Sequence, residues 1–253
     1  MTNDIAIEVR GFSQYFGDVC KLDALDLDVM RNEILGIIGP ARSGKSTFLC
    51  ALNRLNDLVR DSRHEGTIVI DGRDICGPDT DVIELRRRLG MVFATPVPLP
   101  RSIYENVAFG ARRAGIRGRD NLDAIVRDSL QKGGLWEEVR DRLETSGLKL
   151  SGGQQQRLCL ARILAVKPEF ILLDEPTSGL DPISTMKIED SLRRLKSEFT
   201  IILVTNNTKQ AARVADRTAF FLNGELVEVG PTAKIFTAPD DQRTDDYLRG
   251  RFG

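Results

Sequence analysis

Short apolar runs alternate with segments of helical periodicity along the chain, a pattern typical of an α/β fold. The runs at 34–38, 169–173 and 200–204 are almost continuously apolar. Parallel strands that are covered on both faces have this pattern. Apolar residues recur at helical spacing over residues 45–58, which predicts a helix directly after the first strand. We therefore predict a parallel sheet with covering helices.

Other segments alternate between apolar and polar residues, as strands with one exposed face do. Residues 5–9 and 24–30 show this alternation near the start of the chain. Residues 217–229 predict a hairpin that turns at Asn223 and Gly224, because Asn-Gly favours the turns that join antiparallel strands.

The pattern changes at residues 95–100, where three prolines occur in six residues. Such a segment fits neither a helix interior nor a central strand. Residues 111–150 are rich in charge and have helical periodicity. We predict a helical insertion over 96–155 between two halves of an α/β core, 1–95 and 156–253, which together form one discontinuous domain.

Composition narrows the class of protein. The chain has 253 residues, of which 41% are hydrophobic and 29% charged, as is typical of globular proteins. It carries 36 Lys+Arg and 37 Asp+Glu, so it lacks the basic excess of a nucleic-acid binder. No apolar run approaches the roughly 20 residues of a membrane span. The first ten residues have no basic segment followed by an apolar one, so we expect a cytosolic chain without a secretory signal.

Cysteine and histidine are scarce. Four widely spaced cysteines without a Cys-x-x-Cys pair predict reduced, mostly buried thiols; they are Cys20, Cys50, Cys76 and Cys159. His64, the single histidine, excludes a multi-histidine metal site and is expected in a surface loop before residues 67–70.

A phosphate-binding pattern, G-x-x-x-x-G-K-[ST], follows the first apolar run and opens the predicted helix. Glycines let backbone N–H groups close around phosphate oxygens, and a helix N-terminus favours an anion. We expect Lys45 to reach the β- and γ-phosphates and Ser46 to coordinate Mg²⁺. A glycine-rich turn before a core helix is the structural alternative. The expected nucleotide-binding residues are Gly39, Pro40, Ala41, Arg42, Ser43, Gly44, Lys45, Ser46 and Thr47.

Two carboxylates follow the second apolar run. Asp174 ends this strand and is expected to hold Mg²⁺ directly or through water. Glu175 is then suitable as the general base that orients the attacking water. Two exposed acids at a strand end are the alternative.

The sequence Leu150-Ser-Gly-Gly-Gln-Gln-Gln-Arg157 precedes another apolar helix. We expect Ser151 to be the N-cap of this helix, and two glycines allow close backbone approach. These residues predict either a second anion-binding helix start or a plain helix cap.

Taken in order, these motifs and Ser178-Gly-Leu-Asp181 resemble the nucleotide-binding subunits of ABC transporters over essentially the whole chain. The chain is most similar to the ATP-binding subunits of bacterial phosphate importers. The segments that carry this similarity are 52–58, 81–93, 102–110, 150–162, 174–189, 211–228 and 243–253.

The resemblance implies an α/β P-loop NTPase (RecA-like) core with an N-terminal antiparallel β-subdomain and an inserted helical subdomain. It implies a dimer with two ATP molecules between the protomers, in which each P-loop faces Ser151, Gly152, Gly153 and Gln154 of the partner. Asp181 matches an aspartate that communicates across the dimer. Phe16 matches the aromatic that stacks on adenine; Tyr15 is the neighbouring alternative, and core packing of Phe16 is another.

The resemblance also implies partners. Two integral membrane permease subunits would dock near residues 95–110, and a phosphate-binding protein would act indirectly. This places the chain at the cytoplasmic face of the inner membrane as a peripheral subunit without a span of its own. The second protomer is either an identical chain or a paralogous ATPase. Phosphate as the transported substrate rests on the resemblance alone.

The chain departs from the family at three places. Ala94 replaces a glutamine that contacts Mg²⁺ and water, and Asn206 replaces a histidine that senses the γ-phosphate. Arg42 follows Ala41 where relatives have Ser-Gly, and it either contacts phosphate or strains the turn. We expect slowed hydrolysis with ATP binding intact.

Two other functions compete with the importer ATPase. One is a regulatory module that closes on ATP and rarely hydrolyses it. The other is an ABC ATPase acting on ribosomes or DNA, which typically has tandem cassettes or long coiled coils that this chain lacks.

Overall fold

A computed structural model describes residues 4–251 of the chain. Its central sheet has six strands in the order β10-β9-β3-β8-β7-β6, in which every pair is parallel except β10 with β9. The strands are β3 (Ile34–Ile38), β6 (Leu89–Val92), β7 (Phe170–Asp174), β8 (Thr200–Val204), β9 (Arg217–Leu222) and β10 (Glu225–Pro231). This confirms the three predicted apolar strands and the hairpin. Asn223 and Gly224 form its turn with positive φ angles of 51° and 91°.

Alternate residues of the parallel strands face two different cores. Leu35 and Ile37 of β3 pack with α1 (Lys45–Leu52) and the antiparallel sheet. Ile201 and Leu203 of β8 face the opposite side, which α6 (Gly152–Leu164) and α7 (Pro182–Leu195) cover. Because both faces are covered, nearly every residue of these strands is buried, which explains the continuous apolar runs.

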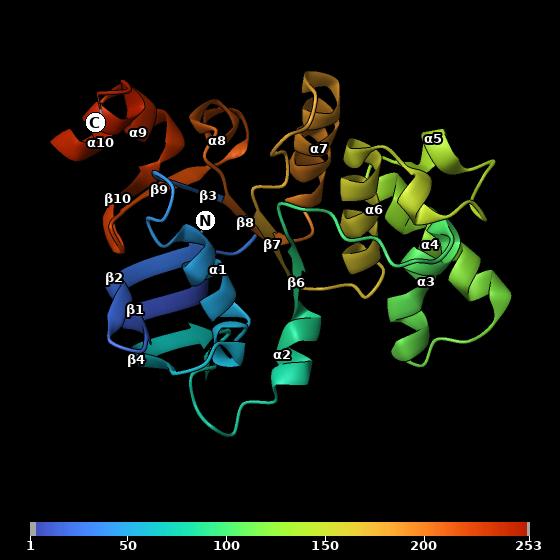
Figure 1. Ribbon diagram of the computed structural model, residues 1–253, viewed down its shortest axis with the longest axis horizontal. Coiled ribbons are helices and arrows are strands. Elements are labelled where there is room, and N and C mark those ends of the chain that lie inside the picture. Colours follow the sequence, from blue (N-terminus) through green and yellow to red (C-terminus); the bar gives the residue numbers. More distant parts are fainter. Residues whose placement is uncertain (1–3, 252–253) are drawn as a thin grey trace.

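An antiparallel sheet with the order β2-β1-β4-β5 stands beside this core (Figure 1). Its strands are β1 (Ile5–Phe16), β2 (Val19–Met30), β4 (Ser62–Ile70) and β5 (Arg73–Asp74). The predicted strands at 5–9 and 24–30 are confirmed as parts of longer ones. The expected loop at His64 is wrong: His64 lies in β4 opposite Gln14, and its ring stacks on Phe12 with 6.0 Å between centroids.

The helix expected over 45–58 is shorter than predicted. α1 ends at Leu52, and a separate 3-10 turn covers Asn56–Leu58. Arg54 between them has a φ of 59°, which a helix cannot accommodate. Its guanidinium donates to the carbonyl of Ile75 at 2.6 Å and pairs with Asp57. These tertiary contacts outweigh the helical periodicity.

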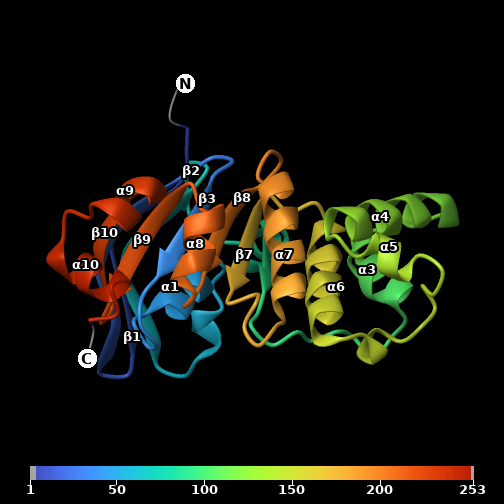
Figure 2. The ribbon, with the colours of Figure 1, turned by 90° about the horizontal axis from the view of Figure 1, so that it is seen from above.

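A helical subdomain forms the end of the molecule opposite the antiparallel sheet (Figures 1 and 2). It contains α3 (Ile103–Arg113), α4 (Arg119–Lys132), α5 (Trp136–Val139) and a 3-10 turn at Gly147–Lys149. α6 crosses the position 155/156 at which the sequence placed the subdomain boundary. Leu158 and Ala161 of α6 pack in the helical subdomain, whereas Leu160 and Leu164 pack under the central sheet. One helix therefore belongs to both cores.

The remaining helices are α2 (Val82–Arg88), α8 (Thr208–Val214), α9 (Thr232–Thr237) and α10 (Gln242–Leu248). Residues 1–3 of the segment considered for a secretory signal, and the last two residues of the 243–253 segment, lie outside the described residues. Within residues 4–251, no helix has the length and apolar character that a membrane span needs.

The four cysteines are free thiols, as expected, but they are not mostly buried. Only Cys159 is buried, whereas Cys20 is exposed and Cys50 and Cys76 are half-buried. Burial raises the pKa of both Cys50 and Cys76 to about 11, which keeps these two thiols protonated near neutral pH.

Candidate functional site

The P-loop, residues 39–47, joins the carboxyl end of β3 to the start of α1. Gly39 and Gly44 have φ angles of 151° and 99°, a range that favours glycine. A Cβ atom on Gly39 would lie 2.1 Å from the carbonyl oxygen of Phe221. Only glycine fits this position, so β9 and the loop pack backbone to backbone.

Arg42 occupies a strained position within the P-loop. Its φ of 67° is in the left-handed region, which is unfavourable for a residue with a side chain. From the sequence, Arg42 either contacts phosphate or strains the turn. The positive φ shows that the turn is strained. The Arg42 side chain is exposed, so a phosphate contact stays a prediction.

Lys45 is the first residue of α1 and only 4% exposed. Its ammonium donates hydrogen bonds to the carbonyls of Gly39 (2.8 Å) and Pro40 (2.7 Å) and lies 3.4 Å from the Ser43 hydroxyl. Burial lowers the pKa of Lys45, while the charge of Glu175 and then that of Asp174 counteract this. A cation is thus held at the centre of the loop.

Ser46 and Asp174 meet at the carboxyl ends of the strands. β3 and β7 flank β8, and all three are parallel, so their carboxyl ends share one edge of the sheet. The Ser46 hydroxyl donates to Oδ1 of Asp174 at 2.9 Å. Burial raises the pKa of Asp174, and the bond from Ser46 and the charge of Lys45 oppose this rise. A hydroxyl and a carboxylate oxygen in contact are a donor set that suits Mg²⁺.

Glu175 follows Asp174 in a strained conformation with a φ of 46°. Its Oε1 accepts a hydrogen bond from the side-chain amide of Asn206, which follows β8. Burial raises the pKa of Glu175, although the charge of Lys45 lowers it. A strained backbone persists only where the surrounding structure holds it in place, and such residues are frequent at functional sites. Glu175 and Asn206 line one hollow of about 320 Å³ together with Thr177, Ser178, Gly179, Thr205 and Asn207.

Ala94 lies two residues after β6 and is half-buried. Its methyl group can neither donate nor accept a hydrogen bond. The preceding residue, Phe93, accepts a bond through its carbonyl from the amide of Gln156 on α6 at 2.8 Å. Gln156 is 2% exposed, and its Oε1 has no partner among the described residues. No sequence motif marks Gln156, whose only signal is its place in the Gln154-Gln-Gln156 run.

The signature segment, residues 151–154, begins α6 with a complete capping box. The Ser151 hydroxyl accepts from the backbone N–H of Gln154, and the Gln154 side chain accepts from that of Ser151 at 3.1 Å. The N-cap prediction for Ser151 is confirmed. Within residues 4–251, no hydrogen bond or ion pair joins the signature segment to the P-loop.

Asp181 is the N-cap of α7. Its carboxylate accepts from the backbone N–H groups of Ile183 (3.0 Å) and Ser184 (2.9 Å) and from the Ser184 hydroxyl (2.6 Å). The hydroxyl bond and then the backbone bonds lower the pKa of Asp181. The exposed carboxylate is thus fixed in direction at the start of a helix.

The two aromatic candidates for adenine stacking differ in their surroundings. The guanidinium of Arg63 lies 3.7 Å from the centre of the Tyr15 ring and covers one of its faces. Phe16 ends β1, is half-buried and belongs to none of the hydrophobic cores formed by residues 4–251. These surroundings favour Phe16 and weaken the core-packing alternative for it.

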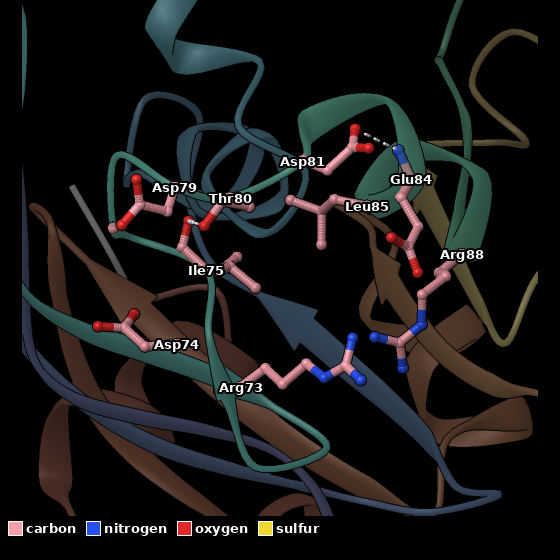
Figure 3. Close-up of a pocket in the computed structure, with 10 residues that line it drawn as sticks. Arg73, Asp74, Ile75, Asp79, Thr80, Asp81, Glu84, Leu85 and Arg88 are labelled. Carbon is pink, nitrogen blue, oxygen red and sulfur yellow. Dashed lines mark hydrogen bonds between the residues drawn. The ribbon is translucent and has the colours of Figure 1, made fainter.

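A separate cavity of about 430 Å³ lies between β5, α2 and the loop joining them (Figure 3). Arg88, one of its lining residues, precedes β6 and pairs with Glu169 at 2.7 Å, just before β7. The cavity is therefore near the amino ends of these strands, whereas Asp174 is at a carboxyl end. Asp81 in its wall is already used as the N-cap of α2. The cavity is not part of the P-loop site.

The P-loop, the two carboxylates at the carboxyl end of β7 and the capped start of α6 define a P-loop nucleotide-binding protein. The family model described as ABC transporter matches residues 22–178. The phosphate import ATP-binding protein PstB 2 of Bacillus subtilis (strain 168) is 53% identical over 247 residues, which are 98% of this chain and 92% of that protein. The chain belongs to the ABC transporter family.

Two solved structures share the fold. A bacterial Atm1-family ABC exporter with ATP bound superposes with a TM-score of 0.80 at 28% identity. All of this chain is covered, but it spans only 43% of the exporter chain. The ATP-binding cassette MJ0796, in a dimeric post-hydrolysis state bound to ADP and Pi, superposes with a TM-score of 0.76 at 27% identity. That match covers 89% of this chain and 98% of MJ0796.

Proposed function

We propose that the protein is the ATP-hydrolysing subunit of an ABC importer for inorganic phosphate. One observation supports the ATPase: Ser46, next to the P-loop Lys45, lies 2.9 Å from the carboxylate of Asp174 at the carboxyl edge of the sheet. Phosphate as the substrate is supported by the 53% identity to a phosphate import ATP-binding protein. The imported ion never contacts this subunit, so the chain's own residues do not select it.

The residues of the site have distinct tasks in hydrolysis. Ser46 and Asp174 hold Mg²⁺, which neutralises phosphate charge when it is bound. Lys45 exchanges the carbonyls of Gly39 and Pro40 for the β- and γ-phosphate oxygens of ATP, while backbone N–H groups of residues 39–47 bind the same phosphates. Glu175 accepts a proton from the attacking water. Phe16 stacks on the adenine.

The second protomer completes each site. Ser151, Gly152, Gly153 and Gln154 bind the nucleotide held by the partner's P-loop, and Asp181 communicates between the two sites. The partner is an identical chain or a paralogous ATPase. Two integral permease subunits dock near residues 95–110 of the helical subdomain, at the cytoplasmic face of the inner membrane, and a phosphate-binding protein supplies the ion to them. Residues 1–253 then form one nucleotide-binding domain, with 96–155 as its helical part.

Hydrolysis at this site is slow. Ala94 supplies neither a hydrogen bond to the attacking water nor an oxygen ligand to Mg²⁺. The side-chain amide of Asn206 donates to Glu175 and carries no positive charge. Losing one such electrostatic contribution typically costs about 10²–10³ in rate. Two losses at one site need not add.

The experiment compares ATPase rates of the purified wild-type chain, a Lys45→Ala variant and an Ala94→Gln/Asn206→His double variant. The wild type turns over ATP, Lys45→Ala does not, and the double variant is about a hundred- to a thousandfold faster than the wild type. Equal rates for the wild type and Lys45→Ala contradict an ATPase. Equal rates for the wild type and the double variant contradict slowed hydrolysis only.

Transport needs a separate measurement. Phosphate uptake by cells that express the chain with its permease subunits is expected to depend on Lys45. Uptake that Lys45→Ala leaves unchanged contradicts the importer assignment.

A second function is supported by the bond between Asn206 and Glu175, which occupies the expected base. In this case the chain is a regulatory module that dimerises on ATP and scarcely hydrolyses it. Tight ATP-dependent dimerisation without measurable turnover distinguishes this module from the transport ATPase.

A further inference from the structure

Glu138 is the centre of a polar cluster where three helices meet. It lies on α5, and its Oε1 accepts hydrogen bonds from Lys187 on α7 (2.6 Å) and Arg157 on α6 (2.7 Å). Its Oε2 accepts from the side-chain amide of Gln154 at 2.9 Å. Arg157 is only 2% exposed. The pKa of Glu138 is lowered to about 2, mainly by its hydrogen bond with the Arg157 guanidinium. The carboxylate is therefore charged under all ordinary conditions.

Two members of this cluster reach the backbone of the signature segment. The Gln154 amide donates to Glu138 and accepts from the backbone N–H of Ser151 at 3.1 Å. Arg157 donates through Nε to the carbonyl of Gly153 at 3.2 Å. Glu138 thus fixes the orientation of the amide that completes the cap of α6.

The first turn of α7 packs against the same segment, and α6 and α7 lie side by side in Figure 2. A Cβ atom on Gly153 would lie 2.4 Å from the hydroxyl of Ser184, so this approach needs glycine. Ser184 also donates to the carboxylate of Asp181 at 2.6 Å. Residues 151–154 and 181–184 are consequently held next to each other. One turn further along α7, Lys187 pairs with Glu138 of α5, which in turn accepts from Arg157 of α6.

We infer that Glu138 and Lys187 are positioning residues that hold the signature segment and the start of α7 as one rigid surface for the nucleotide of the second protomer. This inference rests on the proposed function, in which the signature segment faces the partner's P-loop. Glu138 belongs to the protomer that supplies this surface. It therefore acts on the other protomer's site, and the P-loop of its own chain does not depend on it.

The test measures ATP-driven dimerisation of the full chain by sedimentation, with Glu175→Gln present throughout to prevent hydrolysis. Lys187 is 44% exposed, so replacing it removes the bridge at little cost to the fold. We expect Lys187→Met to weaken dimerisation about two- to fivefold. Glu138→Gln, which also loses the charge opposite Arg157, is expected to weaken it about tenfold. Binding of a fluorescent ATP analogue to dilute monomer is expected to be unchanged.

Three further variants separate positioning from general damage. Lys187→Arg keeps the charge and restores dimerisation. Arg193→Met is the matched control, because Arg193 is on the same helix, is also 44% exposed and pairs with Asp190 within α7. It leaves dimerisation unchanged. Because Lys187 acts through Glu138, the double variant Glu138→Gln/Lys187→Met is no weaker than Glu138→Gln alone.

The inference is wrong if Lys187→Met dimerises as the parent does, if Arg193→Met weakens dimerisation equally, or if the monomer loses nucleotide affinity in parallel. A parent chain that binds ATP but never dimerises contradicts the dimer of the proposed function, and the inference with it. The two failures are distinguishable. Failure of the inference alone leaves a parent chain that dimerises on ATP, whereas failure of the proposed function shows in the parent chain itself.

Discussion

The side-chain amide of Asn206 donates a hydrogen bond to the carboxylate of Glu175. The contact follows from the sheet: Asp174 at the end of β7 pairs with Val204 at the end of β8, so the residues that come next emerge side by side. By the family resemblance, Asn206 stands where relatives have a histidine that senses the γ-phosphate. In the structure its amide is directed at the expected general base instead.

The first prediction concerns the pH dependence of hydrolysis. Glu175 must be ionised to accept a proton, so kcat rises as pH rises through its pKa, which burial has raised. Asn206 donates to the ionised form and favours it. Asn206→Leu removes this donor, so the pKa of Glu175 rises further and the rising limb of the pH–kcat profile moves to higher pH. Steady-state ATPase rates across the acidic range measure this shift.

Asn207→Ala is a suitable control for that experiment. Asn207 is the adjacent residue, but its side chain caps α8 by accepting from the backbone N–H of Gln210. Its loss costs about 1 kcal/mol of stability and does not move the pH profile. An identical profile for Asn206→Leu and the wild type contradicts the role assigned to the amide.

The second prediction concerns the close approach of β9 to the P-loop. Gly39→Ala places a methyl group against the carbonyl of Phe221 at a φ that disfavours side chains. We expect a loss of about 2–3 kcal/mol in the free energy of unfolding and a loss of ATP binding. Gly77→Ala is the matched control, because a Cβ there meets nothing within 4 Å and its φ is not positive. Equal denaturation midpoints for the two variants contradict this account.

Much of the fold follows from the sequence because buried parallel strands must be apolar on both faces. Two predictions were wrong, the length of the helix that begins at Lys45 and the loop at His64, because local sequence patterns do not contain long-range contacts. Arg54 ends α1 through contacts with residues more than twenty positions away, which no local periodicity contains. His64 extends a strand because Gln14 lies opposite it in β1, although its flanking residues are polar. In both places, contacts with residues distant in sequence determine the local backbone conformation.

Some residues of the site are predictable from the sequence and others are not. Lys45, Ser46 and Asp174 belong to recognisable motifs, and the order of the strands in the sheet brings these motifs together. Glu138 has no motif, and its importance arises only when α5, α6 and α7 meet. The bond from Asn206 to Glu175 depends on side-chain directions at two strand ends, which residue types alone do not specify.

The third prediction concerns Gln156, which links α6 to the segment before Ala94. Its amide bonds to the carbonyl of Phe93, while its buried Oε1 has no partner in the described part of the chain. Gln156→Leu removes both the bond and the unpaired oxygen, so the changes in unfolding free energy nearly cancel, to within about 1 kcal/mol. The segment 93–100 loses one of its hydrogen bonds to α6, whereas the bond from Arg162 to the carbonyl of Val97 is kept. Backbone amide hydrogen exchange is expected to be faster in residues 93–100 and unchanged in α6. Faster exchange in both segments together with a large loss of stability contradicts this prediction.

The fourth prediction concerns the acid stability that Glu138 confers. The pKa of Glu138 is lowered from 4.5 to about 2, mainly by Arg157 and then by Lys187 and Gln154. A group whose pKa is depressed on folding stabilises the protein above its unfolded pKa, and this stabilisation is lost as pH falls toward the folded value. The window for Glu138 is therefore from pH 4.5 down to about 2.

Urea unfolding at a series of pH values tests this window. The wild-type free energy of unfolding is expected to fall most steeply with decreasing pH, Lys187→Met less steeply, and Glu138→Gln least, because glutamine binds no proton in either state. Lys187→Met is intermediate because Arg157, the larger cause of the shift, is still present. The stability difference between the wild type and Glu138→Gln accordingly shrinks toward pH 2 and is largest near neutrality. A difference that is constant across the range means that Glu138 contributes packing alone and that its ion pairs add nothing to stability.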